Sequence, residues 1–248
     1  MVKNIENTKI EVNMLEEQFE LPKEIQSKIH EFWKEAQIKT PDLWDGELMC
    51  VSSYERNENL VSITCKKTTY SHYLYNERIG LPMEYRCNSL AAGCILETRD
   101  DYYIIGEMAE NTSFPKGLQP CGGSVEKKDK ENEKINVLKT IEREAKEELN
   151  LNLQDKEQVI SNNIKLISLP TDIINTYMIF TKCKLNMNKS EMEKHYKNYL
   201  KTLIEKNDEV EFSKIHFIKK QNVREQLKKF KNPKRKYLLE LLEVDSNS

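Results

Sequence analysis

The sequence has no long hydrophobic run, and its start does not contain the apolar core of a secretory signal peptide. A membrane-spanning helix needs about 20 consecutive apolar residues, and a signal peptide needs a shorter apolar core behind a basic start. We therefore expect a cytoplasmic protein with no membrane partner.

An excess of charge is absent as well. The formal net charge is −2 over 248 residues, so the chain has no overall positive field that would attract a nucleic acid. With 38% hydrophobic and 32% charged residues, the chain can bury one substantial core with extra elements, or two small cores. We expect a water-soluble protein whose partner is not a nucleic acid.

Cysteine motifs are also absent. The six cysteines contain no CxxC pair and no zinc-site spacing, which predicts reduced and mostly buried thiols. Cys121 lies beside a pair of glycines, but no histidine motif accompanies it, so nothing indicates thiol catalysis. The six are Cys50, Cys65, Cys87, Cys94, Cys121 and Cys183.

The stretch from Gly122 to Leu151 does contain a clear pattern. Apolar residues recur in its second half at spacings of three and four, which is typical of an amphipathic helix. These residues are Ile135, Leu138, Ile141, Ala145 and Leu149. The remaining positions of the predicted helix are mostly polar.

Three glutamates of this predicted helix, Glu144, Glu147 and Glu148, are spaced i, i+3 and i+4. Their carboxylates would project from neighbouring points of one helical face, where each like-charged pair costs roughly 0.2–0.5 kcal/mol. A bound divalent cation would offset this repulsion, and carboxylate oxygens suit Mg²⁺ or Mn²⁺. The alternative interpretation is a solvated charged face without a ligand.

The glycine pair ahead of the helix favours the metal interpretation, because glycines permit close approach of a ligand to the backbone. Here the sequence resembles the signature of the Nudix hydrolase family. The matching residues are Gly122-Gly123, Val125-Glu126, Arg143-Glu144, Ala145, Glu147-Glu148, Asn150 and Leu151.

The resemblance implies a Nudix-type α/β/α sandwich of the α+β or α/β class, with a mixed β-sheet plus an N-terminal helix and hairpin extension. It also implies that Glu144, Glu147 and Glu148, together with the carbonyl of Gly122, hold Mg²⁺ or Mn²⁺ on a diphosphate. Arg143 would brace the loop before the helix by a hydrogen bond to a carboxylate or carbonyl.

The sequence departs from the family pattern in two places. The loop before Arg143 is several residues longer, so both Glu131 and Glu133 compete for the position of the signature's middle glutamate. Asn150 stands where the family has glycine. Asparagine is the next best residue at a left-handed helix end, so this substitution is mild.

Further site candidates lie outside the signature. Glu209 and Glu211 precede a short β-rich run, where many Nudix enzymes place a catalytic base; a solvated acidic loop is the alternative. Glu148 also competes for the role of the base. The aromatic and hydroxyl-rich run 68–75 predicts a base or sugar pocket, or else packing between elements. Its candidate substrate contacts are Tyr70, His72 and Tyr73, and Lys116 is a further one in the connection before the glycines.

Local patterns predict most of the remaining elements. We expect a weakly ordered arm over 1–20, a helix over 21–39, a hairpin of 47–54 with 59–66, and a strand over 90–97 followed by one over 102–106 that pairs back onto it. Two strands over 164–169 and 172–185 follow the signature. Ser190 and Glu193 predict a capped helix over 190–206. A last strand over 214–218 precedes helices over 222–230 and 234–242.

These patterns suggest three regions: an N-terminal extension over 1–85, a Nudix domain over 86–220 and a helical tail over 221–248. The implied function is hydrolysis of a nucleoside diphosphate linked to another moiety, with a nucleotide sugar preferred over ADP-ribose, dinucleotides or nucleoside triphosphates. A non-hydrolytic nucleotide-binding sensor is the alternative. The extension could also mediate a homodimer.

Overall fold

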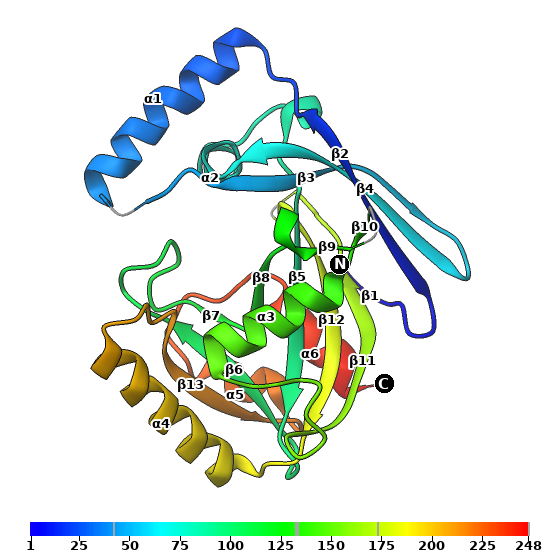
Figure 1. Cartoon of the computed structure of the whole chain (residues 1–248), viewed down its shortest axis with the longest axis vertical. Helices are drawn as coiled ribbons and strands as arrows, with labels where there is room; N and C mark the ends of the chain where they lie inside the picture. The colour runs from blue at the N-terminus through cyan, green and yellow to red at the C-terminus, as the bar shows by residue number, and fades with distance from the viewer. Residues whose placement is uncertain (42, 132–133, 173, 248) are drawn as a thin grey trace.

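The computed structural model describes residues 1–41, 43–131, 134–172 and 174–247. In Figure 1, α1, α2 and strands β2 to β4 form the upper part of the molecule, and the sheet that carries α3 forms the lower part. The strands are β1 (Val2–Asn4), β2 (Lys9–Gln18), β3 (Glu47–Arg56), β4 (Leu60–Thr69), β5 (Ser89–Glu97), β6 (Tyr102–Met108), β7 (Leu118–Gln119), β8 (Cys121–Ser124), β9 (Lys130–Glu131), β10 (Lys134–Ile135), β11 (Val159–Ser168), β12 (Thr176–Leu185) and β13 (Phe212–Lys219). The α-helices are α1 (Lys23–Lys39), α2 (Tyr70–Arg78), α3 (Val137–Leu149), α4 (Lys189–Lys206), α5 (Val223–Lys228) and α6 (Leu238–Ser246).

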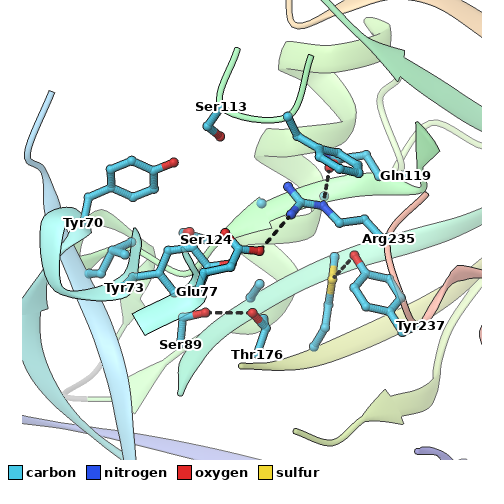
Figure 2. A pocket seen from close by; sticks show the side chains of 16 residues that line it. Tyr70, Tyr73, Glu77, Ser89, Ser113, Gln119, Ser124, Thr176, Arg235 and Tyr237 are labelled. Carbon is cyan, nitrogen blue, oxygen red and sulfur yellow. Dashed lines mark hydrogen bonds and ion pairs between the residues drawn. The ribbon is translucent and has the colours of Figure 1, made fainter. Parts of the chain in front are cut away.

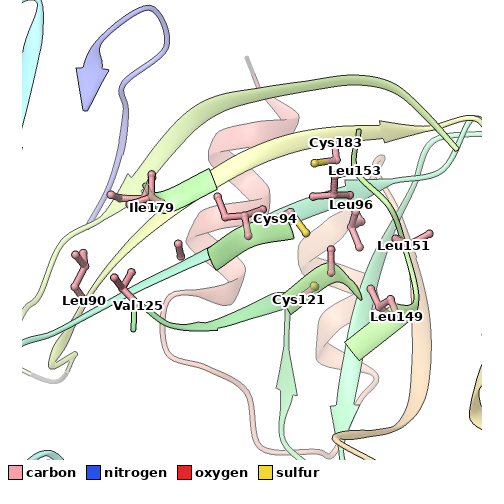
Figure 3. Close-up of a cluster of buried hydrophobic side chains, with 14 of the residues drawn as sticks. Leu90, Cys94, Leu96, Cys121, Val125, Leu149, Leu151, Leu153, Ile179 and Cys183 are labelled. Atoms are coloured by element: carbon pink, nitrogen blue, oxygen red, sulfur yellow. The ribbon is translucent and has the colours of Figure 1, made fainter. Parts of the chain in front are cut away.

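The lower part is a three-layered body built around β5. This strand pairs in parallel with β12 and antiparallel with β8, so the sheet is mixed. Because side chains alternate along a strand, Ala92 and Cys94 pack in the core that contains the apolar face of α3, whereas Ala91 and Ile95 pack with α6. Figure 3 shows the first of these cores. The predicted α/β/α fold class is confirmed.

The N-terminal residues are not the weakly ordered arm that their polar composition predicted. Val2 of β1 pairs with Ser168 of β11, and β2 runs parallel to β4 with Ile10 opposite Val61. Widely spaced apolar residues of this segment are buried, among them Val12. The prediction was wrong because neighbouring strands supply the pairing, which the composition of this segment does not reveal.

The remaining elements of the extension match the sequence patterns. The predicted helix over 21–39 is α1, and the predicted hairpin is β3 with β4. Edge-to-face contacts of Phe32 with Tyr75 and of Trp33 with Tyr70 hold α1 against α2. Strands β1, β2 and β3 pair with strands from the predicted Nudix region, and the predicted domain boundaries stay a prediction.

After residue 85, the predicted strands and helices are present with shifted ends. Strand β6 pairs mainly with β13, and only Glu97 and Tyr103 join it to β5, so the predicted 90–97/102–106 hairpin is limited. Helix α4 is capped by Asn188 with Glu191, not by the predicted Ser190 with Glu193. Asparagine is as good an N-cap as serine, so the helix begins two residues earlier, at the capping box of Asn188 and Glu191.

None of the described helices is long and apolar enough to cross a membrane.

Candidate metal and substrate site

Helix α3 carries two of its three candidate metal ligands on its buried side. Ile141, Ala145 and Leu149 are fully buried, and Glu144 and Glu148 lie beside this stripe with only 6% and 2% of their surface exposed. The helix ends at Asn150 in the left-handed conformation with φ 53°, as the sequence predicts.

Three carboxylates meet here, two from α3 and one from the segment before β13. Glu144, Glu148 and Glu211 each place one oxygen within 4.8 Å of the others. Oε2 of Glu148 accepts the backbone N–H of Gly122 at 2.8 Å, while Oε1 is buried and has no hydrogen-bond partner. Buried polar atoms are rarely left without a partner, so this oxygen points to a ligand.

The electrostatics of the cluster favour a cation. Burial raises the pKa of Glu144 to about 7, since the carboxylate of Glu211 adds to this effect and the guanidinium of Arg143 only partly opposes it. Burial also raises the pKa of Glu148 well above its ordinary value, with further contributions from Glu144 and Glu211. An oxygen-only donor set of this kind fits Mg²⁺ or Mn²⁺.

Arg143 links the helix to the glycine loop and to two glutamates. Its Nη1 donates to Oε1 of Glu144 at 2.6 Å and to Oε2 of Glu147 at 3.0 Å, and its Nη2 donates to the carbonyl of Ser124 at 3.0 Å. The side chain of Glu147 is 47% exposed and is not part of the three-carboxylate cluster. Its role as a metal ligand therefore stays a prediction.

The two glycines allow β8 to lie against both α3 and β5. Gly122 has φ 146°, and a Cβ on it would lie 2.5 Å from Cα of Gly93. A Cβ on Gly123 would lie 2.5 Å from Oε1 of Glu144. A side chain at either position would therefore displace β8 from the carboxylates. The structure shows the N–H of Gly122 bound to Glu148, and the predicted metal contact of its carbonyl stays a prediction.

Sequence reasoning missed Asp129 in the long loop. Its buried Oδ2 accepts the hydroxyl of Thr140 at 2.8 Å and the N–H of Glu126 at 2.9 Å, and it lies 3.5 Å from Nη2 of Arg143. The reciprocal pairing of Glu126 and Asp129 around one short helical turn is a capping box, a signal that the sequence contains.

The two competing loop glutamates are not both described. Glu131 is exposed and accepts from the side-chain amide of Asn136 at 2.8 Å, at the start of α3. Glu133 lies outside the described residues. The structure therefore does not bring Glu131 into the carboxylate cluster.

Of the two acidic candidates before β13, the structure brings only Glu211 to the cluster, whereas Glu209 is exposed. Helix α4 supports this arrangement from one side. The hydroxyl of Tyr196 donates to the carbonyl of Phe212, next to Glu211, and the hydroxyl of Tyr199 donates to the carbonyl of Glu147 at 2.7 Å. One helix thus contacts both segments that supply carboxylates.

A cavity of about 200 Å³ lies beside β8, between the N-terminal extension and the C-terminal segment. Figure 2 shows Tyr70, Tyr73 and Glu77 of α2 on one side and Arg235 on the other. The backbone of Gly122 to Ser124 also lines the cavity, so the cavity and the carboxylate cluster share one short strand.

The predicted substrate contacts separate into two groups. Tyr70 and Tyr73 line the cavity. His72 points elsewhere: its buried ring bonds Thr68 at 2.7 Å and the carbonyl of Tyr85 at 2.8 Å, and burial lowers its pKa. Lys116 is exposed and pairs with Glu110 at 2.7 Å. Neither His72 nor Lys116 reaches the cavity.

Sequence reasoning missed Glu77, Phe114 and Arg235 as cavity residues. The position of Glu77 has a local signal, because Tyr70, Tyr73 and Glu77 are spaced i, i+3 and i+7 and share one face of a helix. No local sequence signal places Arg235 at the cavity, since only the fold brings the C-terminal segment to α2.

No family model and no curated protein matches the sequence. Among solved structures, the DR0079 protein of Deinococcus radiodurans is similar over 80% of this chain and 98% of its own, with a TM-score of 0.48 and 14% identity. A Nudix hydrolase of Alicyclobacillus acidocaldarius matches 64% of this chain and 95% of its own chain, with a TM-score of 0.40 and 11% sequence identity. A C. elegans Ap4A hydrolase matches 63% of this chain and 96% of its own chain, with a TM-score of 0.37 and 14% sequence identity.

The solved structures that this chain is similar to thus include proteins described as Nudix hydrolases, the family that the signature residues resemble. Similarity of this degree carries no argument about activity or substrate. The chemistry must come from the arrangement of the side chains.

Proposed function

We propose that this protein is a metal-dependent hydrolase that cleaves the diphosphate of a nucleoside diphosphate linked to another moiety, in particular a nucleotide sugar. The observation that carries the proposal is the cluster of buried Glu144 and Glu148 with half-buried Glu211, and the unpartnered Glu148 oxygen within it. Buried carboxylates without sufficient positive charge are costly to fold, and a cation site explains why they are kept.

Glu144, Glu148 and Glu211 would hold Mg²⁺ or Mn²⁺. When bound, such an ion neutralises diphosphate charge and acidifies a water molecule for attack on phosphorus. Arg143 orients Glu144 and Glu147 through its two hydrogen bonds. We assign proton acceptance from the attacking water to Glu211, because it faces the helix carboxylates from the segment that precedes β13.

The cavity supports a substrate with a group beyond the diphosphate. It shares β8 with the cluster, so a diphosphate at the carboxylates would place its attached group near Tyr70 and Tyr73. Phenol rings pack against flat or ring-shaped groups and offer a hydroxyl, which suits a nucleotide sugar. A small-molecule nucleotide substrate and action in the cytoplasm are parts of the same proposal.

A non-hydrolytic nucleotide sensor is the second candidate, and one observation favours it. Glu147 lies half exposed against Arg143 rather than in the cluster, which leaves one signature glutamate away from the metal position. Binding without turnover would fit this arrangement.

The test is release of nucleoside monophosphate from nucleotide sugars, ADP-ribose, dinucleotides and nucleoside triphosphates, with Mg²⁺ or Mn²⁺. Glu148→Gln and Glu147→Gln are the test variants. Glu142→Gln is a matched control, since Glu142 lies on the same helix and accepts a hydrogen bond from Gln154 instead of joining the cluster.

We expect one substrate class to be turned over by the wild type and by the control, and not by Glu148→Gln. Nucleotide binding without turnover of any class would favour the sensor. Turnover that survives Glu148→Gln would contradict the assignment of the cluster.

A further inference from the structure

The N-terminal extension and the C-terminal segment face each other across the cavity with opposite charges. Oε1 of Glu77, on α2, lies 3.9 Å from Nη1 of Arg235, and both side chains line the cavity (Figure 2). A separation of 3.9 Å is too long for a direct hydrogen bond. Both charged groups are therefore close enough to contact one ligand in the cavity that they line, and neither is used up by a direct hydrogen bond to the other.

Arg235 is held in place without help from Glu77. Its Nε donates to Oε1 of Gln119 at 2.9 Å, and its guanidinium carbon lies 4.4 Å from the ring centroid of Phe114. Its backbone N–H donates to the carbonyl of Leu118 at 3.0 Å. Stacking and a hydrogen bond on Nε fix the plane of the fork and leave the terminal nitrogens directed to the Glu77 side.

The opposite wall is equally organised. Tyr70, Tyr73 and Glu77 share one face of α2, and the two phenol rings lie 6.0 Å apart, centroid to centroid. Trp33 of α1 packs edge-on against Tyr70 at 6.0 Å. The face thus presents two neighbouring rings, of which Tyr70 is supported by Trp33, and one carboxylate to a ligand.

We propose that this cavity binds the vicinal diol of a sugar ring, with Glu77 and Arg235 as the residues that select it. Each hydroxyl both donates and accepts a hydrogen bond. Adjacent hydroxyls donate to the two oxygens of Glu77, while Arg235 donates to the hydroxyl oxygens, and the ring packs against Tyr70 and Tyr73. A free phosphate fits less well, because Glu77 repels it.

The proposed function enters this inference at one point, the source of the diol. In a nucleotide sugar, the diol is either that of the nucleotide's ribose or that of the sugar attached to the diphosphate. Two ligand series separate these sources. The first series compares ADP, GDP, CDP and UDP with their 2′-deoxy forms. The second compares glucose 1-phosphate with 2-deoxyglucose 1-phosphate and 3-deoxyglucose 1-phosphate.

The dissociation constant of each ligand is measured by calorimetry with the full-length protein. No metal is added, so that no ligand is hydrolysed. For one of the two series, we expect removal of a diol hydroxyl to weaken binding to the wild type about tenfold. The same ligand change should alter binding to Glu77→Gln less than about twofold, because the acceptor of the hydroxyl is already impaired. The series that shows this pattern names the source of the diol.

Glu84→Gln is the matched control, since Glu84 is an exposed carboxylate outside the cavity, and it should discriminate as the wild type does. Arg235→Lys is a second variant that keeps the charge and loses the fork, and we expect it to weaken the diol-bearing ligand more than the deoxy ligand. Thermal denaturation of each variant verifies folding.

Equal binding of diol and deoxy ligands to the wild type would overturn the proposal, as would unchanged discrimination by Glu77→Gln or no binding in either series. These outcomes are independent of the turnover assay. Loss of turnover in Glu148→Gln with no diol discrimination would contradict only this inference. Discrimination without any turnover would contradict only the hydrolase.

Discussion

Two groups of buried or half-buried carboxylates in this molecule have opposite electrostatic surroundings. Glu97 and Asp245, with 3% and 0% of their surface exposed, are surrounded by lysines; Lys182 and Lys184 each place Nζ 2.5 Å from a Glu97 oxygen. In the cluster of Glu144, Glu148 and Glu211, one arginine accompanies three carboxylates. The first group is neutralised by the chain itself, and the second is not.

The pKa values follow this difference. Burial alone would raise the pKa of Glu97, but hydrogen bonds from Lys182 and Lys184 outweigh it and hold the pKa at about 2. Burial raises the pKa of Glu144 to about 7, because Arg143 compensates only in part. The comparison teaches that burial of a carboxylate does not by itself indicate function; missing countercharge does.

The largest expected effect separates the two groups by activity. Glu148→Gln keeps the shape of the side chain and removes its charge, so we expect kcat/KM on the substrate found in the panel to fall at least about 10³-fold. The free energy of unfolding of the metal-free protein should stay the same or rise at neutral pH, because a carboxyl whose pKa is raised by burial destabilises the folded state there and a neutral amide does not. Urea denaturation measures this, and a clear loss of stability would make Glu148 a structural residue.

Metal addition should stabilise the protein through the cluster of Glu144, Glu148 and Glu211, and not through Glu97 and Asp245. At a Mg²⁺ concentration of about 100 times the dissociation constant, the free energy of unfolding should rise by about 2.7 kcal/mol, which thermal denaturation detects as a shift of roughly 5–10 °C. Glu148→Gln should show little shift. An equal shift in both proteins would locate the binding elsewhere.

Substitution in the lysine-paired group of Glu97 and Asp245 should lower stability and leave activity unchanged, the reverse of Glu148→Gln. Glu97→Gln leaves Lys182 and Lys184 without their acceptor, and we expect the free energy of unfolding to fall by about 2 kcal/mol. This is less than for a fully buried pair, because the two lysine side chains are 16% and 23% exposed. Turnover by the folded variant should be unchanged. A variant as stable as the wild type but inactive would reverse the comparison.

Acid should remove the difference between the wild type and Glu97→Gln. The folded pKa of about 2 lies below the ordinary value of 4.5, so the contribution of Glu97 is fully present above about pH 4.5 and is lost as the pH falls through 2. The two urea unfolding curves should therefore converge between pH 5 and pH 2. A constant difference over this range would mean that the effect does not come from the charge.

The smallest expected effect concerns the support of α3. Tyr199→Phe removes the hydroxyl that donates to the carbonyl of Glu147, which costs about 1 kcal/mol and should weaken Mg²⁺ binding about fivefold by calorimetry. Thr202→Val is the control, since that hydroxyl bonds within α4 to the carbonyl of Asn198. Equal effects of both substitutions would assign the loss to α4 itself.

Much of the fold follows from local patterns, and its exceptions have physical causes. The helix over 137–149, the β3–β4 hairpin and the left-handed Asn150 depend on residues close in sequence. Strands β1 and β2 depend on distant partners, so polar composition misled the prediction for 1–20. His72 was predicted at the pocket from its neighbours, but its ring bonds Thr68 and does not line the cavity that Tyr70 and Tyr73 line.

The sequence by itself determined the helix that carries Glu144, Glu147 and Glu148, because the spacing of its apolar residues sets which side is buried. Successive residues turn by about 100°, so Glu148 lies toward the apolar stripe and Glu147 away from it, as observed. Only the tertiary structure decided that Glu211 completes the cluster and that Arg235 faces Glu77. These partners lie far apart in the chain, and their meeting depends on sheet pairing and helix packing that no local pattern contains.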